Sequence, residues 1–218
     1  MGLHLNFELR LPGSMTSERV TATLTRLRAF ALTLQLKNVS RIYHAAPGCD
    51  VARGEGLRRL ASVLADVFVD DAPPLIADID TARGFAVHPG DGCETATFAF
   101  MRRADRSGHS AEWFWHSSCK TQYASVIGDR HLVTCHTGLV SLLDYAIDLG
   151  VNVTVRDETH YWETRDEQRL ITEVHAMNRV VAAFAGKLSD ASGQADAMVI
   201  APIFRHPGFE RLEMERED

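Results

Sequence analysis

The chain has 218 residues and a mass of 24.2 kDa, enough for one domain or two small ones. Apolar residues make up 45% and charged residues 24%, which excludes a disordered chain, a collagen-like chain and a coiled-coil rod. The formal net charge of −6 gives no overall electrostatic case for a nucleic-acid partner. No apolar run approaches the roughly 18 residues that span a bilayer, so we expect no membrane segment.

The N-terminus alternates polar and apolar residues and does not resemble a signal peptide. Four cysteines lie at positions 49, 93, 119 and 135, and no pair has CxxC spacing. We therefore expect reduced thiols and a cytoplasmic location.

Hydrophobic periodicity predicts alternating strands and helices along the chain. In chain order, the expected elements are a strand over 3–11, a helix capped by Thr16 or Ser17 and reaching Leu34, a strand over 41–44, a helix over 57–68, strands over 84–88, 95–103 and 111–121, a helix over 136–149, a strand over 151–156, and a helix over 165–187. For the last helix we expect Thr164 and Glu167 to form a capping box and an apolar stripe ending near Phe184 to pack on a sheet.

This order predicts an α+β fold with helices packed on a mixed β-sheet. The three middle strands form an antiparallel meander, and the passage from 112 to 157 forms a right-handed βαβ crossover between parallel neighbours. We expect a single domain over 1–218. A boundary near 72–83 is the alternative, and the charged end 213–218 should be frayed.

Two histidines and two cysteines offer zinc ligands: His116, Cys119, Cys135 and His136. Alternation along the 111–121 strand, however, sends His116 and Cys119 to opposite faces. We therefore expect no metal and no cofactor, with Cys119 buried beside Trp113 and Trp115.

Cys135 is a candidate nucleophile because it lies at or just before the predicted start of the 136–149 helix. A helix N-terminus and a nearby imidazolium both lower a thiol pKa. The adjacent His136 does not face Cys135, so His131 would have to fold back as the base. A structural role for Cys135 is the alternative.

Polar side chains follow one another on the outer face of the 111–121 strand, among them His116, Lys120 and Gln122. A solvated sheet face is the simpler interpretation. Ligands of open sheets, however, favour the crevice where a strand's carboxyl end meets the next helix. Here that crevice would hold Lys120, Gln122, Tyr123, His136 and Thr137, a set suited to a carboxylate or phosphate.

Glu158, His160 and Tyr161 follow the 151–156 strand and would reach the same edge if the two strands are parallel. Glu158 or His136 could then transfer a proton. Alternatively, the acidic residues merely solvate a turn and complement the next helix dipole. The sequence contains no Walker loop, GxGxxG, GxSxG, HExxH or EF-hand motif.

Three short segments, 119–124, 157–158 and 161–166, resemble an uncharacterised family of bacterial proteins. The resemblance covers the C-terminal half and implies a bacterial cytosolic origin. It transfers no activity and no catalytic residue.

The leading hypothesis is therefore a site for a small anionic molecule at the carboxyl edge of the sheet. The candidate catalytic residues are His136, Glu158 and Cys135, and the candidate ligand-binding residues are His116, Lys120, Gln122 and Tyr123. The alternative is a non-catalytic interaction or regulatory module acting as a homodimer. Its contact would come from the 161–162 loop or from the edge of the N-terminal strand.

Overall fold

The computed structural model describes residues 3–45, 79–103, 112–192 and 203. Its strands and helices are β1 (Leu5–Leu11), α1 (Ser17–Ala31), β2 (Asn38–Val39), β3 (Tyr43–Ala45), β4 (Ile79–His88), β5 (Ala96–Arg103), β6 (Trp113–Cys119), the 3₁₀ helix η2 (Gln122–Val126), α3 (Asp129–Asp148), β7 (Asn152–Asp157), α4 (Tyr161–Thr164) and α5 (Glu167–Ser192). The expected helix over 57–68, most of the alternative boundary near 72–83 and the charged end 213–218 lie outside the described residues.

The strands form one sheet in the order β2-β4-β5-β6-β1-β7, with β3 also paired to β4. The α+β class and the meander β4-β5-β6 are confirmed. The mixed character of the sheet is not: every pairing between the described strands is antiparallel.

β6 and β7 run in the same direction but are not neighbours, because β1 lies between them. Leu9 of β1 is opposite Trp115 on one side and Val153 on the other. The β6–α3–β7 passage therefore steps over β1, whereas we expected it to join adjacent strands. The carboxyl ends of β6 and β7 still lie at the same end of the sheet. Because β1 is paired on both sides, it cannot form the edge contact with a partner that we considered.

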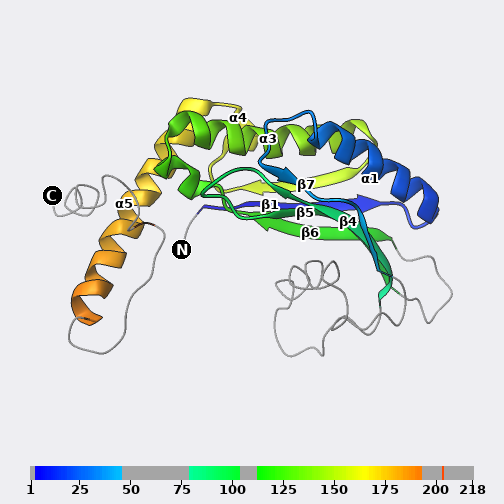
Figure 1. The fold of residues 1–218 in the computed structure, drawn as a ribbon, viewed down its shortest axis with the longest axis horizontal. Helices are drawn as coiled ribbons and strands as arrows, with labels where there is room; N and C mark the ends of the chain where they lie inside the picture. Colours follow the sequence, from blue (N-terminus) through cyan, green and yellow to red (C-terminus); the bar gives the residue numbers. More distant parts are fainter. Residues whose placement is uncertain (1–2, 46–78, 104–111, 193–202, 204–218) are drawn as a thin grey trace.

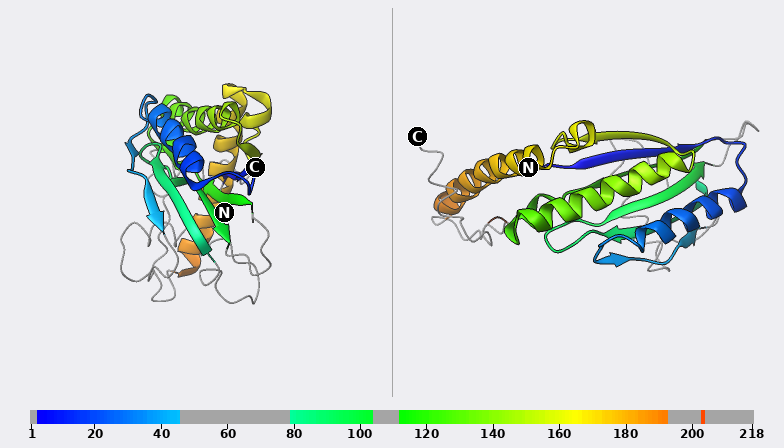
Figure 2. Two further views of the ribbon diagram at one scale, coloured as in Figure 1. Left: turned by 90° about the vertical axis from the view of Figure 1, so that its right-hand side faces the viewer. Right: turned by 90° about the horizontal axis from the view of Figure 1, so that it is seen from above.

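α1 and α3 lie side by side over one face of the sheet, and α5 extends beyond its end (Figures 1 and 2). The apolar face of β1 is fully buried beneath these helices. On β6, Trp113, Trp115 and Cys119 are buried and His116 is exposed, as strand alternation predicts.

α1 begins as expected, with the side chain of Thr16 accepting a hydrogen bond from the backbone N–H of Arg19. α3 begins at Asp129, earlier than the expected 136. Leu132 and Cys135 are buried with Leu139, so the apolar stripe of the helix continues back beyond the expected start.

The capping box expected for α5 is replaced by an Asp166 cap. Its Oδ1 accepts hydrogen bonds from the backbone N–H groups of Gln168 and Arg169. Leu170 is fully buried, but Phe184 is 48% exposed, so the expected burial of that ring is wrong. α5 packs mainly against α3, η2 and α4.

Candidate active site at the carboxyl edge of the sheet

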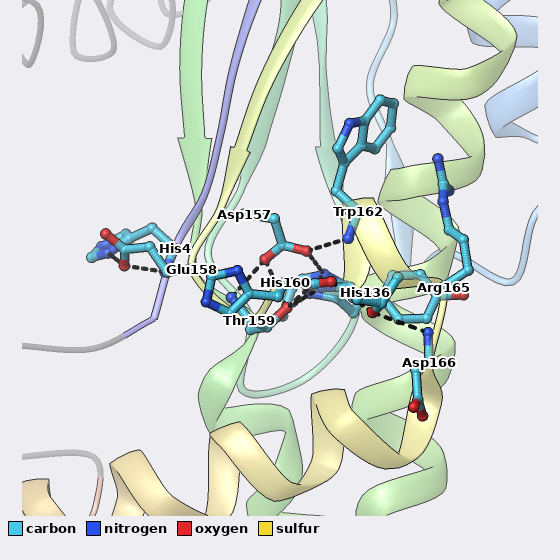
Figure 3. Close-up of polar contacts among 12 residues, drawn as sticks. His4, His136, Asp157, Glu158, Thr159, His160, Trp162, Arg165 and Asp166 are labelled. Atoms are coloured by element: carbon cyan, nitrogen blue, oxygen red, sulfur yellow. Dashed lines mark hydrogen bonds and ion pairs between the residues drawn. The ribbon is translucent and has the colours of Figure 1, made fainter.

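His136 of α3 joins the ends of β6 and β7 through both nitrogens of its ring (Figure 3). Nδ1 lies 2.9 Å from Oγ1 of Thr121, two residues after β6 ends. Nε2 lies 3.1 Å from Oδ2 of Asp157, the last residue of β7. The imidazole is only 1% exposed, and the other two residues are 3% exposed. The strand ends and the helix therefore meet in a filled network, where we had expected an open crevice.

Asp157 receives hydrogen bonds from three further donors (Figure 3). Its Oδ1 accepts from the backbone N–H and the hydroxyl of Thr159, at 2.9 and 2.7 Å, and its Oδ2 accepts from the backbone N–H of Trp162 at 2.9 Å. Burial acts to raise the pKa of Asp157, but the hydrogen bond and charge of His136 and the bonds from Thr159 prevail and lower it to about 2. The carboxyl group is therefore ionised at neutral pH.

The ionised carboxylate determines the direction of the hydrogen bonds. A carboxylate oxygen can only accept, so Nε2–H of His136 donates to Asp157. Nδ1 accepts from the hydroxyl of Thr121 when the imidazole is neutral and donates to the same oxygen when the imidazole is protonated. We call this chain of hydroxyl, imidazole and carboxylate the relay; its members are Thr121, His136 and Asp157.

The short helix α4 covers the relay. The Tyr161 ring meets the His136 ring edge-on at 5.5 Å between centroids. Residues with left-handed backbone flank α4, namely His160 at φ 58° and Arg165 at φ 56°. Arg165 lies over the Trp162 ring and forms a bidentate ion pair with Asp144, so this segment is attached to α3. Tyr161 is buried, which removes it as the exposed aromatic contact of an interaction module.

Lys120 follows the last residue of β6 and lies beside the relay in the chain. Its Nζ is 4.0 Å from Oε1 of Glu94 and 6.0 Å from the centroid of the Tyr123 ring. The other oxygen of Glu94 accepts from the backbone N–H of Lys120 at 3.0 Å. The Lys120 side chain is 16% exposed and so retains some contact with solvent. Burial raises the pKa of Tyr123.

Gln122 is not on the strand face where we expected it, because β6 ends at Cys119. Its amide is buried in η2 and accepts from the backbone N–H of Leu3 at 2.9 Å while donating to Oδ1 of Asn178 at 2.8 Å. This side chain therefore connects the start of β1 to α5. With both hydrogen-bonding ends occupied, Gln122 has a structural role and does not line a crevice.

His116 and Glu158 do not join the relay either. His116 is exposed on the face of the sheet opposite the helices, where it pairs in register with Glu8. Glu158 accepts from the backbone N–H of His4 at 2.9 Å and lies 3.5 Å from Nδ1 of the same residue. The two residues therefore belong to separate surface contacts.

Cys135 is buried within α3, away from the helix N-terminus where we had placed it. His131 lies one turn earlier on the same helix, with Nε2 3.6 Å from Sγ of Cys135. The helix itself thus brings the imidazole to the thiol, and no folding back is needed. Within the described residues, no group of three or more histidine, cysteine or acidic side chains is arranged to hold a metal ion.

Sequence reasoning missed Thr121, Thr159 and the role of Asp157. The signal for Asp157 was present, because it continues the every-second-residue series of Val153 and Val155 onto the inner face of β7. An acid at a core-facing strand position requires hydrogen-bond partners inside the protein.

Comparison of the chain with models of protein families, with curated proteins and with solved structures gives no significant match. Among the residues that the structure describes, no helix is long and apolar enough to cross a membrane.

Proposed function

We propose that the end of the sheet where β6 and β7 finish is a small-molecule site in which the relay transfers a proton. The observation that carries the proposal is the continuous contact from Thr121 through His136 to Asp157, at 2.9 and 3.1 Å. A hydroxyl bonded to an imidazole that is oriented by an ionised carboxylate has the geometry of an activated nucleophile or a general acid–base pair. The depressed pKa of Asp157 adds support, because such groups gather at functional sites.

Access to the relay would come from movement of α4. The segment has only four residues and lies between His160 and Arg165, two non-glycine residues that are strained by their left-handed backbone. The ion pair of Arg165 with Asp144 is exposed and contributes only about 0–1 kcal/mol to the closed position. Short covering segments of this kind commonly open to admit substrate.

Lys120 is the proposed anchor for an acidic group on the ligand. Its ion pair with Glu94 is long, at 4.0 Å, and Glu94 is itself half exposed. A carboxylate or phosphate could replace Glu94 at little cost, because such pairs are individually weak. We therefore favour a small anionic ligand. From the cysteine spacing we also propose a cytoplasmic location. An interaction module is less well supported, since β1 is internal and Tyr161 is buried.

Thermal melts with inorganic phosphate test the anchor. We expect phosphate to stabilise the wild type and to lose this effect in Lys120→Met, which keeps the apolar stem. Lys37→Met is the matched control, because Lys37 is also ion-paired, with Asp91, but lies elsewhere on the surface. A groove of about 550 Å³ along α3, which includes Arg130, is the rival location. Loss of stabilisation in Arg130→Met instead of Lys120→Met would place the ligand there and contradict the proposal.

Turnover of p-nitrophenyl acetate and p-nitrophenyl phosphate tests the relay. Thr121→Val removes the hydroxyl with little change in volume, and His136→Gln removes the imidazole; both should abolish turnover. Cys135→Ser separates thiol chemistry from relay chemistry and should leave turnover unchanged. Turnover that survives Thr121→Val would show that the relay is not the reacting group.

A further inference from the structure

The turn between β4 and β5 brings a cysteine from the sheet against a cysteine of α3. Cys93 lies in this turn and packs against the buried cluster of side chains that includes Cys135. The two thiols also shift each other's pKa. Gly90 permits the close approach: a Cβ at this position would lie 2.5 Å from Sγ of Cys135 and 2.9 Å from Cε1 of His131. The backbone N–H of Cys93 donates to the carbonyl of Gly90 at 3.1 Å, which holds the turn in place.

His131 completes the cluster. Its Nε2 lies 3.0 Å from the backbone carbonyl oxygen of Asp91 and 3.6 Å from Sγ of Cys135. A carbonyl oxygen can only accept, so Nε2 carries the proton. The sulfur of Cys135 is a second and longer acceptor for the same N–H, in a bifurcated hydrogen bond whose shorter branch goes to Asp91, and such sharing still favours a thiolate.

We propose that Cys93 and Cys135 form a redox-active thiol pair that small hydroperoxides oxidise to a disulfide. This site is separate from the relay and does not depend on the proposed function. Cys93 and His131 are partly exposed, and Asp91 beside them is fully on the surface, whereas Cys135 is almost completely buried beneath the turn. Such a site admits an oxidant the size of hydrogen peroxide more readily than a protein disulfide.

The chemistry proceeds in two balanced steps. The Cys135 thiolate attacks one peroxide oxygen, the O–O bond breaks, and with uptake of a proton water leaves and a sulfenic acid remains. The Cys93 thiol then attacks the sulfenic sulfur, loses its proton, and expels a second water as the S–S bond forms. The two thiols together lose two electrons and two protons, and the peroxide is reduced to two molecules of water.

The pKa values assign the two roles. The thiol of Cys93, aided by the nearby His131, lowers the pKa of Cys135 to about 7 against the opposing effects of burial and Asp91. The thiol of Cys135 and burial raise the pKa of Cys93. Cys135 is therefore the attacking thiol and Cys93 the resolving one. Burial also raises the pKa of Cys119, whose Sγ donates to the carbonyl of Glu94 at 3.2 Å.

Peptide mapping of the oxidised wild-type protein tests the pair directly. Trypsin places the four cysteines in separate peptides, covering 42–53, 84–102, 107–120 and 131–156. After treatment with one equivalent of hydrogen peroxide and alkylation of the remaining thiols, we expect a disulfide between the 84–102 and 131–156 peptides. A Cys135 that stays reduced while another cysteine is oxidised would overturn the proposal.

Variants separate the two roles. Cys93→Ser should stop at the sulfenic acid, detected as a dimedone adduct on the 131–156 peptide, and Cys119→Ser should form the disulfide at the wild-type rate. His131→Gln should slow alkylation of Cys135 at pH 7, by less than the roughly fifteenfold that a full return of its pKa to about 8.5 would give, because Cys93 makes the larger contribution to the lowered pKa. Disulfide formation that requires Cys119, or an alkylation rate unchanged by His131→Gln, would contradict the assignment.

Discussion

Asp157 and His136 meet at the point where β7 ends, with Oδ2 of the carboxylate 3.1 Å from Nε2 of the imidazole and both side chains buried. The carboxylate comes from the sheet and the imidazole from the helix layer, so this contact joins the two layers. An imidazole and an ionised carboxylate inside a protein are stable only when their hydrogen bonds are complete. The threonines at positions 121 and 159 and the backbone of Trp162 complete them here.

Acidification should weaken the fold through Asp157. Its pKa is about 2 in the folded protein and about 3.9 in an unfolded chain. Because the folded pKa is the lower one, the stabilisation is fully present above about pH 5 and is lost as the pH falls through about 2. Linkage gives this contribution as about 2–3 kcal/mol. Urea denaturation of the wild type between about pH 5 and pH 2 measures it.

Asp157→Asn removes the titrating carboxyl group and should show a shallower loss of stability over the same pH range, while being less stable at neutral pH. Asp144→Asn, which removes an exposed carboxyl group, should keep the wild-type slope. Equal slopes for Asp157→Asn and wild type would mean that Asp157 does not carry the linkage.

Replacement of an apolar side chain of α5 by alanine should cost very different amounts of stability at two positions. Leu170 is fully buried, so Leu170→Ala should cost about 2–5 kcal/mol of unfolding free energy. Phe184 is 48% exposed, so Phe184→Ala should cost below about 1 kcal/mol despite the larger side chain. Chemical denaturation of both variants measures the difference. A comparable loss in the two would show that Phe184 is covered by a contact that the structure lacks.

Removal of the Gln122 amide should destabilise the junction between β1, η2 and α5. Gln122→Met leaves the backbone N–H of Leu3 and Oδ1 of Asn178 without partners, at a cost of roughly 2–5 kcal/mol. A double-mutant cycle with Asn178→Leu should give a coupling energy of about 0.5–3 kcal/mol. Additive effects of the two substitutions would show that the amides do not interact.

The left-handed conformation of His160 predicts an unusual ranking of substitutions. His160→Val should cost about 1–2 kcal/mol, because a β-branched side chain is strained at φ 58°. His160→Gly removes that strain and should stay within about 1 kcal/mol of wild type, although glycine is usually destabilising. Thermal denaturation of the two variants gives the ranking. If glycine were the more harmful replacement, the side chain of His160 rather than its backbone would matter.

The period-two pattern of the sequence determined the faces of β1 and β6. Side-chain alternation is local, so Leu9, Trp115 and Cys119 could be assigned to the core and His116 to the surface without knowledge of the fold. The apolar stripe of α1 likewise followed from the spacing of apolar residues within the helix. The start of α3 was not recovered, because Gly128 provides no side-chain cap to mark it.

The partners of each strand and the composition of the site depended on tertiary structure. Periodicity does not specify that β1 inserts between β6 and β7, since strand pairing is a long-range choice. That insertion leaves the ends of β6 and β7 at one edge but two strand spacings apart, and the gap there is filled by His136. The residues that contact His136 are therefore the inward-facing Thr121 and Asp157. Lys120, which precedes Thr121, and Glu158, which follows Asp157, make other contacts. A shift of one residue along a strand moves a side chain to the other face of the sheet. The sequence could therefore indicate the neighbourhood of the site, but only the packing of α3 on the sheet decided which side chains form it.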